Sequence, residues 1–95
     1  MKYSLTYSNA SKNDLRNIFL YIAADNLPRA VTYIDEIEAV IKNLLLFPRM
    51  GRVMEERPNH RRLIHGNHKI IYELNETNKR IMIKHVKNCA QMDKG

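Results

Sequence analysis

Hydrophobic and polar residues follow two different periods along this chain, and these periods separate extended segments from helical ones. Tyr3, Leu5 and Tyr7 alternate with polar residues, which predicts a short strand with one apolar face. From Ser11 to about Ala24 the apolar residues recur every three or four positions, which predicts an amphipathic helix. Its apolar stripe consists of Leu15, Ile18, Phe19 and Ile22.

A second helical period follows a short break. Asp25-Asn26-Leu27-Pro28 interrupts the pattern, and proline is well tolerated at the first position of a helix. The period then runs to Phe47, and Pro48 ends the helix. Its apolar positions are Ala30, Ile34, Ile37, Ile41, Leu44 and Leu45. A break this short between two amphipathic helices predicts an antiparallel helical hairpin.

The segment 49–60 shows no period and contains Gly51 and Pro58, which predicts a loop. Alternation then returns as an antiparallel meander with turns at 65–68 and near 77–78. Gly66 stands at the first central position of the first turn, as a type II′ hairpin requires. The resulting registers direct one set of side chains toward the helices: Leu63, Ile70, Tyr72, Leu74, Ile81 and Ile83.

These elements predict an α+β fold in one domain, residues 1–95. An N-terminal strand is followed by an antiparallel helical hairpin, which packs on one face of a small antiparallel meander. A chain of 95 residues has room for one hydrophobic core. Residues 88–95 have no apolar pattern, so we expect a frayed tail.

The opposite face of the meander combines basic and apolar residues. The same registers assign to it Arg62, Ile64, Lys69, Ile71, Glu73, Met82, Lys84 and Val86. An exposed apolar patch of this kind marks a protein interface. The alternative is that the long Lys and Arg stems cover the apolar side chains by themselves.

Charge is distributed unevenly along the chain. Residues 1–47 carry five basic and five acidic side chains, whereas residues 48–95 carry eleven Lys/Arg and five Asp/Glu, which accounts for the net charge of +6. We therefore expect the C-terminal half to make the contacts with an anionic partner. Charge alone does not tell whether that partner is nucleic acid, an acidic protein or an anionic membrane.

The composition of the chain and the motifs that it lacks exclude several classes of protein. No stretch approaches the roughly 18 apolar residues of a membrane span, and the N-terminus lacks the apolar centre of a signal peptide. The single cysteine, Cys89, excludes an intrachain disulfide. We therefore expect a cytoplasmic protein with no membrane partner. The sequence has no phosphate loop, zinc motif or nucleophile elbow, so we expect no metal and no cofactor.

An arginine cluster and four histidines are the candidate chemical groups. Arg49, Arg52, Arg57, Arg61 and Arg62 lie within 14 positions, and the guanidinium fork suits phosphates and carboxylates. A solvated loop without a partner is the alternative. The histidines are His60, His65, His68 and His85. We expect structural roles for them, with the two turn histidines solvated and His85 at the end of the core face, over a role as general base.

Short motifs in a consistent order span nearly the whole chain. They are Asp14-Leu15, Ile18, Tyr21-Ile22-Ala23, Asn26-x-Pro28-x-Ala30, Ile37, Leu44, Pro48, Gly51-Arg52, Arg62-Leu63, Tyr72 and Val86. This arrangement resembles the ParE branch of the ParE/RelE toxins. The resemblance implies a RelE/ParE-like fold and the toxin of a type II toxin-antitoxin system, of the plasmid stabilisation type, neutralised by a cognate antitoxin.

The resemblance leaves three mechanisms open. The first is a toxin that is not an enzyme and binds DNA gyrase. The second is a RelE-like, ribosome-dependent mRNA endonuclease, with Arg61, Arg62, Lys84 and His85 as its catalytic groups. The segment 87–91 lacks the terminal Tyr or Arg associated with RelE-type cleavage, which favours the first mechanism. The third is an attenuated toxin that only binds its antitoxin. The expected partner-binding residues are Arg49, Arg52, Arg57, Arg62, Ile64, Lys69, Ile71, Met82, Lys84 and Val86.

Overall fold

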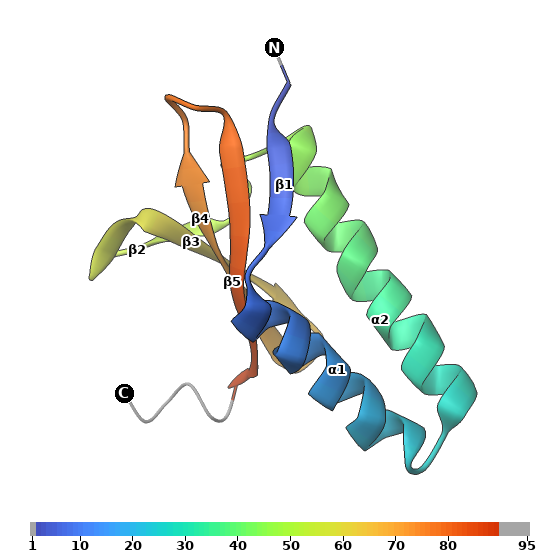
Figure 1. The fold of residues 1–95 in the computed structure, drawn as a ribbon. Coiled ribbons are helices and arrows are strands. Elements are labelled where there is room, and N and C mark those ends of the chain that lie inside the picture. The colour runs from blue at the N-terminus through green and yellow to red at the C-terminus, as the bar shows by residue number, and fades with distance from the viewer. Residues whose placement is uncertain (1, 90–95) are drawn as a thin grey trace.

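Strands and helices in the described chain form an α+β domain, with a helical hairpin against a five-stranded sheet (Figure 1). The structure, a computed structural model, describes residues 2–89. The elements are β1 (Ser4–Tyr7), α1 (Asn9–Ala23), α2 (Leu27–Lys42), the 3₁₀ turn η1 (Asn43–Leu45), β2 (Arg52–Met54), β3 (Arg57–His65), β4 (His68–Asn75) and β5 (Arg80–Asn88). The predicted order of strand, helical hairpin and meander is confirmed.

Both helices begin at a side-chain cap. The Ser8 hydroxyl accepts a hydrogen bond from the Ser11 amide at 3.0 Å, and the Asn26 carboxamide accepts one from the Arg29 amide, also at 3.0 Å. The predicted start of α1 at Ser11 is therefore three residues too late. Ser11 is fully buried within the first turn, where its hydroxyl donates to the Ser8 carbonyl.

The hydrophobic core lies between α2 and the inner face of the sheet. Its main buried side chains are Tyr33, Ile37, Ile41 and Leu44 from the helical side, and Ile70, Tyr72, Leu74, Ile81, Ile83 and Val86 from β4 and β5. The predicted core face of the meander is confirmed, with Leu63 partly buried at its margin. On α2, Tyr33 is buried although the prediction omitted it, and in η1, beyond the end of the helix, Leu44 is buried whereas Leu45 is 38% exposed.

The hairpin turn between β3 and β4 has the predicted geometry. Gly66 has a φ of +56°, and Asn67 does not share this left-handed conformation. A Cβ atom on Gly66 would lie 2.6 Å from the Tyr33 hydroxyl, so α2 also leaves no room for a side chain there. The registers Leu63–Ile70 and Leu74–Ile81 are confirmed.

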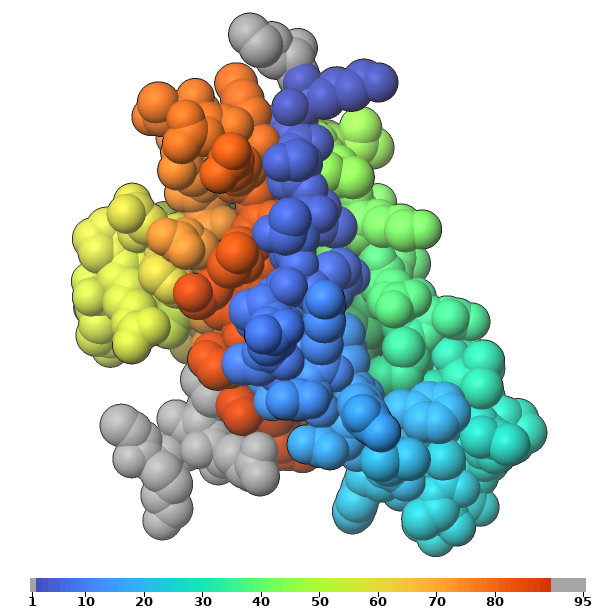
Figure 2. All heavy atoms as spheres, viewed as in Figure 1, coloured from blue at the N-terminus to red at the C-terminus, as the bar shows by residue number. Residues whose placement is uncertain are grey.

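The sheet is larger than the predicted meander. β1 adds to β5 in parallel, and β2 adds to β3, which gives the strand order β1-β5-β4-β3-β2. The prediction of a loop over 49–60 is therefore wrong, because this segment contains β2 and the start of β3. Pro58 is tolerated in β3 because its position has no ladder partner on β2 or β4. Figure 2 shows this end of the sheet projecting away from the helices.

A bulge in β5 changes which residues face the core. Tyr72 pairs with Ile83, but Ile71 pairs with His85, so Lys84 is one extra residue in β5. Val86 consequently turns inward and is 2% exposed, and His85 turns outward. The predictions that Val86 lies on the outer face and His85 on the core face are therefore both wrong, because the bulge reverses the two side chains.

The end of β5 is more ordered than predicted. Asn88 belongs to the strand, and the Cys89 amide donates to the Asn67 carbonyl at 2.7 Å, so the expected fraying is wrong for these two positions. The rest of the expected tail, residues 90–95, lies outside the described residues. None of the helices in residues 2–89 is long and apolar enough to cross a membrane.

Candidate functional site

The candidate site is the outer face of the sheet, the face turned away from α2. Three cross-strand rows form its centre: His60–Glu73–Met82, Arg62–Ile71–His85 and Ile64–Lys69–Lys87. Lys84 also lies on this face, as predicted, and its ammonium lies 4.0 Å from a carboxylate oxygen of Glu73. β2 extends the face, with Arg52 directly opposite Arg62.

The expected apolar patch on this face is much reduced. Ile71 is only 7% exposed, and Val86 lies in the core. Ile64 and Met82 are 57% and 37% exposed, but they lie in different rows on different strands. The exposed apolar residues of this face are therefore fewer than predicted, and they are not adjacent.

The five arginines of the cluster have four different environments in the structure. Within residues 2–89, the side chains of Arg52 and Arg62 form no hydrogen bond or ion pair, so their guanidinium groups are available to an anion. Arg49 forms an ion pair with Glu76 at the edge of the molecule. Arg57 is exposed near the β2–β3 turn.

Arg61 belongs to the inner face and holds a loop. It pairs with Tyr72 across β3 and β4, and its Nη1 donates to the carbonyls of Gly51 at 2.8 Å and Arg49 at 3.2 Å. The Tyr72 hydroxyl supports the same loop, because it donates to the Pro48 carbonyl and accepts from the Gly51 amide. The structure therefore separates Arg61 from Arg62, Lys84 and His85, the other groups of the expected nuclease site.

The turn histidines are bonded to α2, which contradicts the prediction that they are solvated. His65 Nε2 lies 3.0 Å from Glu36 Oε1, and His68 Nδ1 lies 2.7 Å from the Tyr33 hydroxyl. Hydrogen bonds from His65 and Arg29 hold the pKa of Glu36 below its usual value. Burial lowers the pKa of His68, and the nearby His65 lowers it further. These contacts join the β3–β4 turn to the helical hairpin.

We expect acid to destabilise the protein as the pH falls below the ordinary histidine pKa of 6.5. The folded state lowers the pKa of His68 and His60 below 6.5, so the unfolded chain binds more protons at mildly acidic pH. This contribution to stability is complete above pH 6.5 and is lost as the pH falls through the lowered pKa. Urea unfolding at several pH values measures it. His68→Gln should reduce the slope, and an unchanged slope in His68→Gln and His60→Gln would contradict the assignment.

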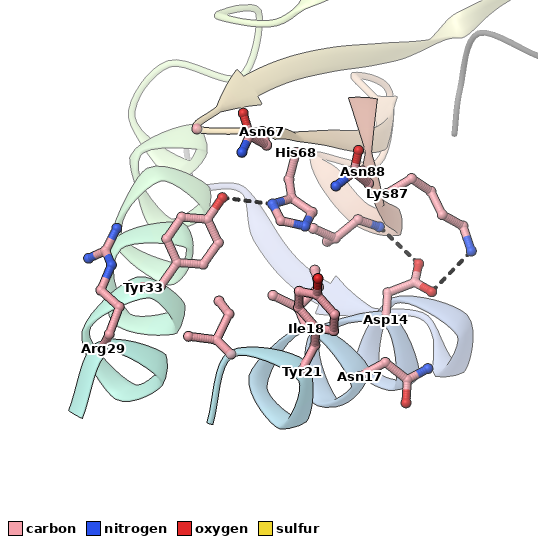
Figure 3. Close-up of a pocket in the computed structure, with 13 residues that line it drawn as sticks. Asp14, Asn17, Ile18, Tyr21, Arg29, Tyr33, Asn67, His68, Lys87 and Asn88 are labelled. Atoms are coloured by element: carbon pink, nitrogen blue, oxygen red, sulfur yellow. Dashed lines mark hydrogen bonds and ion pairs between the residues drawn. The ribbon is translucent and has the colours of Figure 1, made fainter. Parts of the chain in front are cut away.

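A groove opens on the other side of β5, between α1, α2 and the β3–β4 turn (Figure 3). It has a volume of about 830 Å³. Figure 3 shows Asp14 of α1 reaching Lys87 on one side, and Tyr33 reaching His68 on the other. The sequence pattern did not reveal this groove, since Asp14 served there only as a helix-start signal. Within residues 2–89, no group of three or more His, Cys, Asp or Glu is arranged to hold a metal ion.

Two solved structures have similar folds. One is the chromosomal ParDE toxin-antitoxin system from P. aeruginosa, with a TM-score of 0.73, 20% identity and coverage of 90% of this chain and 95% of that chain. The other is the toxin-antitoxin complex RelBE2 from Mycobacterium tuberculosis, with a TM-score of 0.70, 15% identity and coverage of 93% and 99%. At these identities the likeness shows the fold. No curated protein matches the chain by sequence.

A match in sequence, and not only the likeness in fold, shows the family of this chain. The family model described as the ParE toxin of the type II toxin-antitoxin system parDE matches residues 5–92, which includes both helices, β2 to β5 and all of β1 after Ser4. Only the first strand begins a single residue before this match. The chain therefore belongs to the ParE toxin family of type II toxin-antitoxin systems.

Proposed function

We propose that this toxin inhibits growth by binding DNA gyrase through the outer face, and that a cognate antitoxin neutralises it by covering the same face. The observation that carries the proposal is the pair Arg52 and Arg62, which face each other across β2 and β3 without a partner in residues 2–89. Two adjacent unpaired guanidinium groups repel each other and favour an anionic partner. The antitoxin chemistry that fits is an acidic segment, and membership of the ParE family supports gyrase as the target.

The target is tested with purified proteins. The toxin is added to DNA gyrase in a supercoiling assay and, in parallel, to a translation reaction in which mRNA cleavage is followed. The proposal expects inhibition of supercoiling with the mRNA intact. Intact supercoiling at a toxin concentration that fully binds antitoxin would contradict gyrase as the target, and cleaved mRNA would indicate the nuclease.

The second candidate is mRNA cleavage, and the position of His85 favours it. The bulge puts this imidazole beside Lys84 on the outer face, with Nδ1 3.5 Å from Asp14 Oδ2. The two groups are close but do not form a hydrogen bond, and Nδ1 is shielded from solvent. A carboxylate beside an imidazole is a common arrangement for a general base. The engagement of Arg61 by the 49–51 loop counts against this candidate.

Replacing His85 with glutamine separates the two candidates. We expect His85→Gln to leave toxicity in cells nearly intact, because glutamine keeps the size and hydrogen bonding of the side chain and a binding toxin needs no titrating group. A general acid or base commonly contributes about a hundredfold to ten-thousandfold in rate. A collapse of toxicity, with normal folding and normal antitoxin binding, would therefore favour the nuclease.

A further inference from the structure

Beyond the end of β1, backbone groups of β5 have no strand beside them on that edge, and Ser8 and α1 supply their partners. β1 ends at Tyr7, where it pairs with Ile83, so the edge of β5 beyond that point is not covered by a strand. The residue after β1, Ser8, donates its amide to the Ile83 carbonyl at 2.9 Å and its hydroxyl to the Lys84 carbonyl at 2.9 Å. Buried backbone groups without such partners would be costly.

Asp14 completes this support six residues farther along the chain, in α1. Its Oδ2 accepts a hydrogen bond from the Val86 amide at 2.9 Å, and its Oδ1 accepts one from Lys87 Nζ at 3.2 Å. The Asp14 side chain is only 12% exposed, whereas the Lys87 side chain is 41% exposed. Ser8 and Asp14 therefore hold the backbone on both sides of the bulge, from elements more than 70 residues away in the sequence.

The bulge determines the side chains that a partner meets. The extra residue at Lys84 turns Val86 into the core and His85 outward, next to Lys84, which faces outward with or without the bulge. Bulges often redirect side chains in this way next to functional sites. The Lys84 side chain is 33% exposed and its ammonium lies 4.0 Å from Glu73, a loose contact that leaves it able to approach another carboxylate.

We infer that Ser8 and Asp14 are positioning residues for antitoxin recognition: they hold the β5 backbone on both sides of the bulge, and this sets the direction in which Lys84 meets a carboxylate of the antitoxin. This inference rests on the proposed function, because it takes the outer face as the antitoxin site. It adds Ser8, the residue before α1, and Asp14 of α1, neither of which lies on that face. Their effect on the partner is transmitted through the backbone of β5.

Two single variants with one matched control test the inference on the full chain. Ser8→Ala and Asp14→Asn should each weaken binding of the cognate antitoxin about tenfold in titration calorimetry. Asn26→Ala is the control, because it removes the equivalent cap of α2 and touches no part of β5. It should lower the melting temperature while binding changes less than about twofold. Equal weakening by Asn26→Ala would show that the loss reflects stability alone.

A double-mutant cycle shows whether Asp14 acts through Lys84. Lys84→Gln alone should weaken antitoxin binding, and Asp14→Asn should then add little, because the contact that it positions is already lost. Fully additive losses would overturn the inference and leave the proposed function standing. If Lys84→Gln itself has no effect, the outer face at Lys84 is not the antitoxin site, and the inference fails together with that part of the proposed function.

Discussion

The Ile37→Ala variant is expected to lose about 2 to 5 kcal/mol of unfolding free energy, the usual range for truncating a buried isoleucine. Ile37 is fully buried at the centre of α2, within the cluster formed with β4 and β5. Because small domains have a total stability of about 5–15 kcal/mol, this loss is a large fraction of the whole. Each kcal/mol lowers the melting temperature of a domain this size by about 4–8 °C, which calorimetry or circular dichroism measures directly.

An exposed position on the same helix provides the control. Val31 is 47% exposed, so Val31→Ala should change stability by less than about 0.5 kcal/mol. A melting temperature that falls equally in both variants would show that the effect comes from the helix itself. If neither variant shifts the transition, the buried face of α2 is placed incorrectly.

Reversing the charge at Arg52 and Arg62 together is expected to abolish toxicity and antitoxin binding. The two residues face each other on β2 and β3, and both side chains lack a partner within residues 2–89. Arg52→Glu with Arg62→Glu replaces an anion-attracting pair with an anion-repelling one, at a site that offers no compensating cation between them. The readouts are colony formation on induction and antitoxin affinity by titration calorimetry, with the fold checked by circular dichroism.

A matched pair on α1 controls for net charge. Lys12 and Arg16 are exposed, and Lys12→Glu with Arg16→Glu takes the net charge from +6 to +2, as the Arg52 and Arg62 pair also does. The control should keep toxicity and antitoxin affinity, apart from a slower association rate at low salt. Equal losses in both double variants would show that long-range attraction, and not the outer face, carries the binding. Ile71→Asp is a poor probe of this face, because Ile71 is only 7% exposed.

Local signals in the sequence were sufficient for most of the secondary structure and for the registers next to turns. The helical period from Ala30 to Leu44 and the alternation on either side of Gly66 need no distant contact to be read. The two-residue turn aligns Leu63 with Ile70 because the geometry of a tight turn determines the pairing that follows it. The core face of the meander follows from that register.

The outer face depended on contacts between residues far apart in the chain. Uninterrupted alternation in β5 would have put Val86 outside and His85 inside, but Ser8 and Asp14 stabilise an extra residue at Lys84 and reverse both positions. A bulge produces no regular pattern of hydrophobic and polar residues, so its position in β5 could be found only from the contacts with the helix packed beside it.

The arginine cluster also shows which features the sequence predicts and which ones only the tertiary structure determines. Sequence alone identified a cationic segment, because charge and spacing are properties of the chain. The strand register also put Arg62 on the outer face, because successive residues of a strand point to opposite faces. The sequence could not identify the contacts of the two arginines: Arg61 binds the carbonyls of the 49–51 loop, and Arg62 lies opposite Arg52. The second contact required β2, a three-residue strand that is too short for any alternation to predict and is held by its pairing with β3.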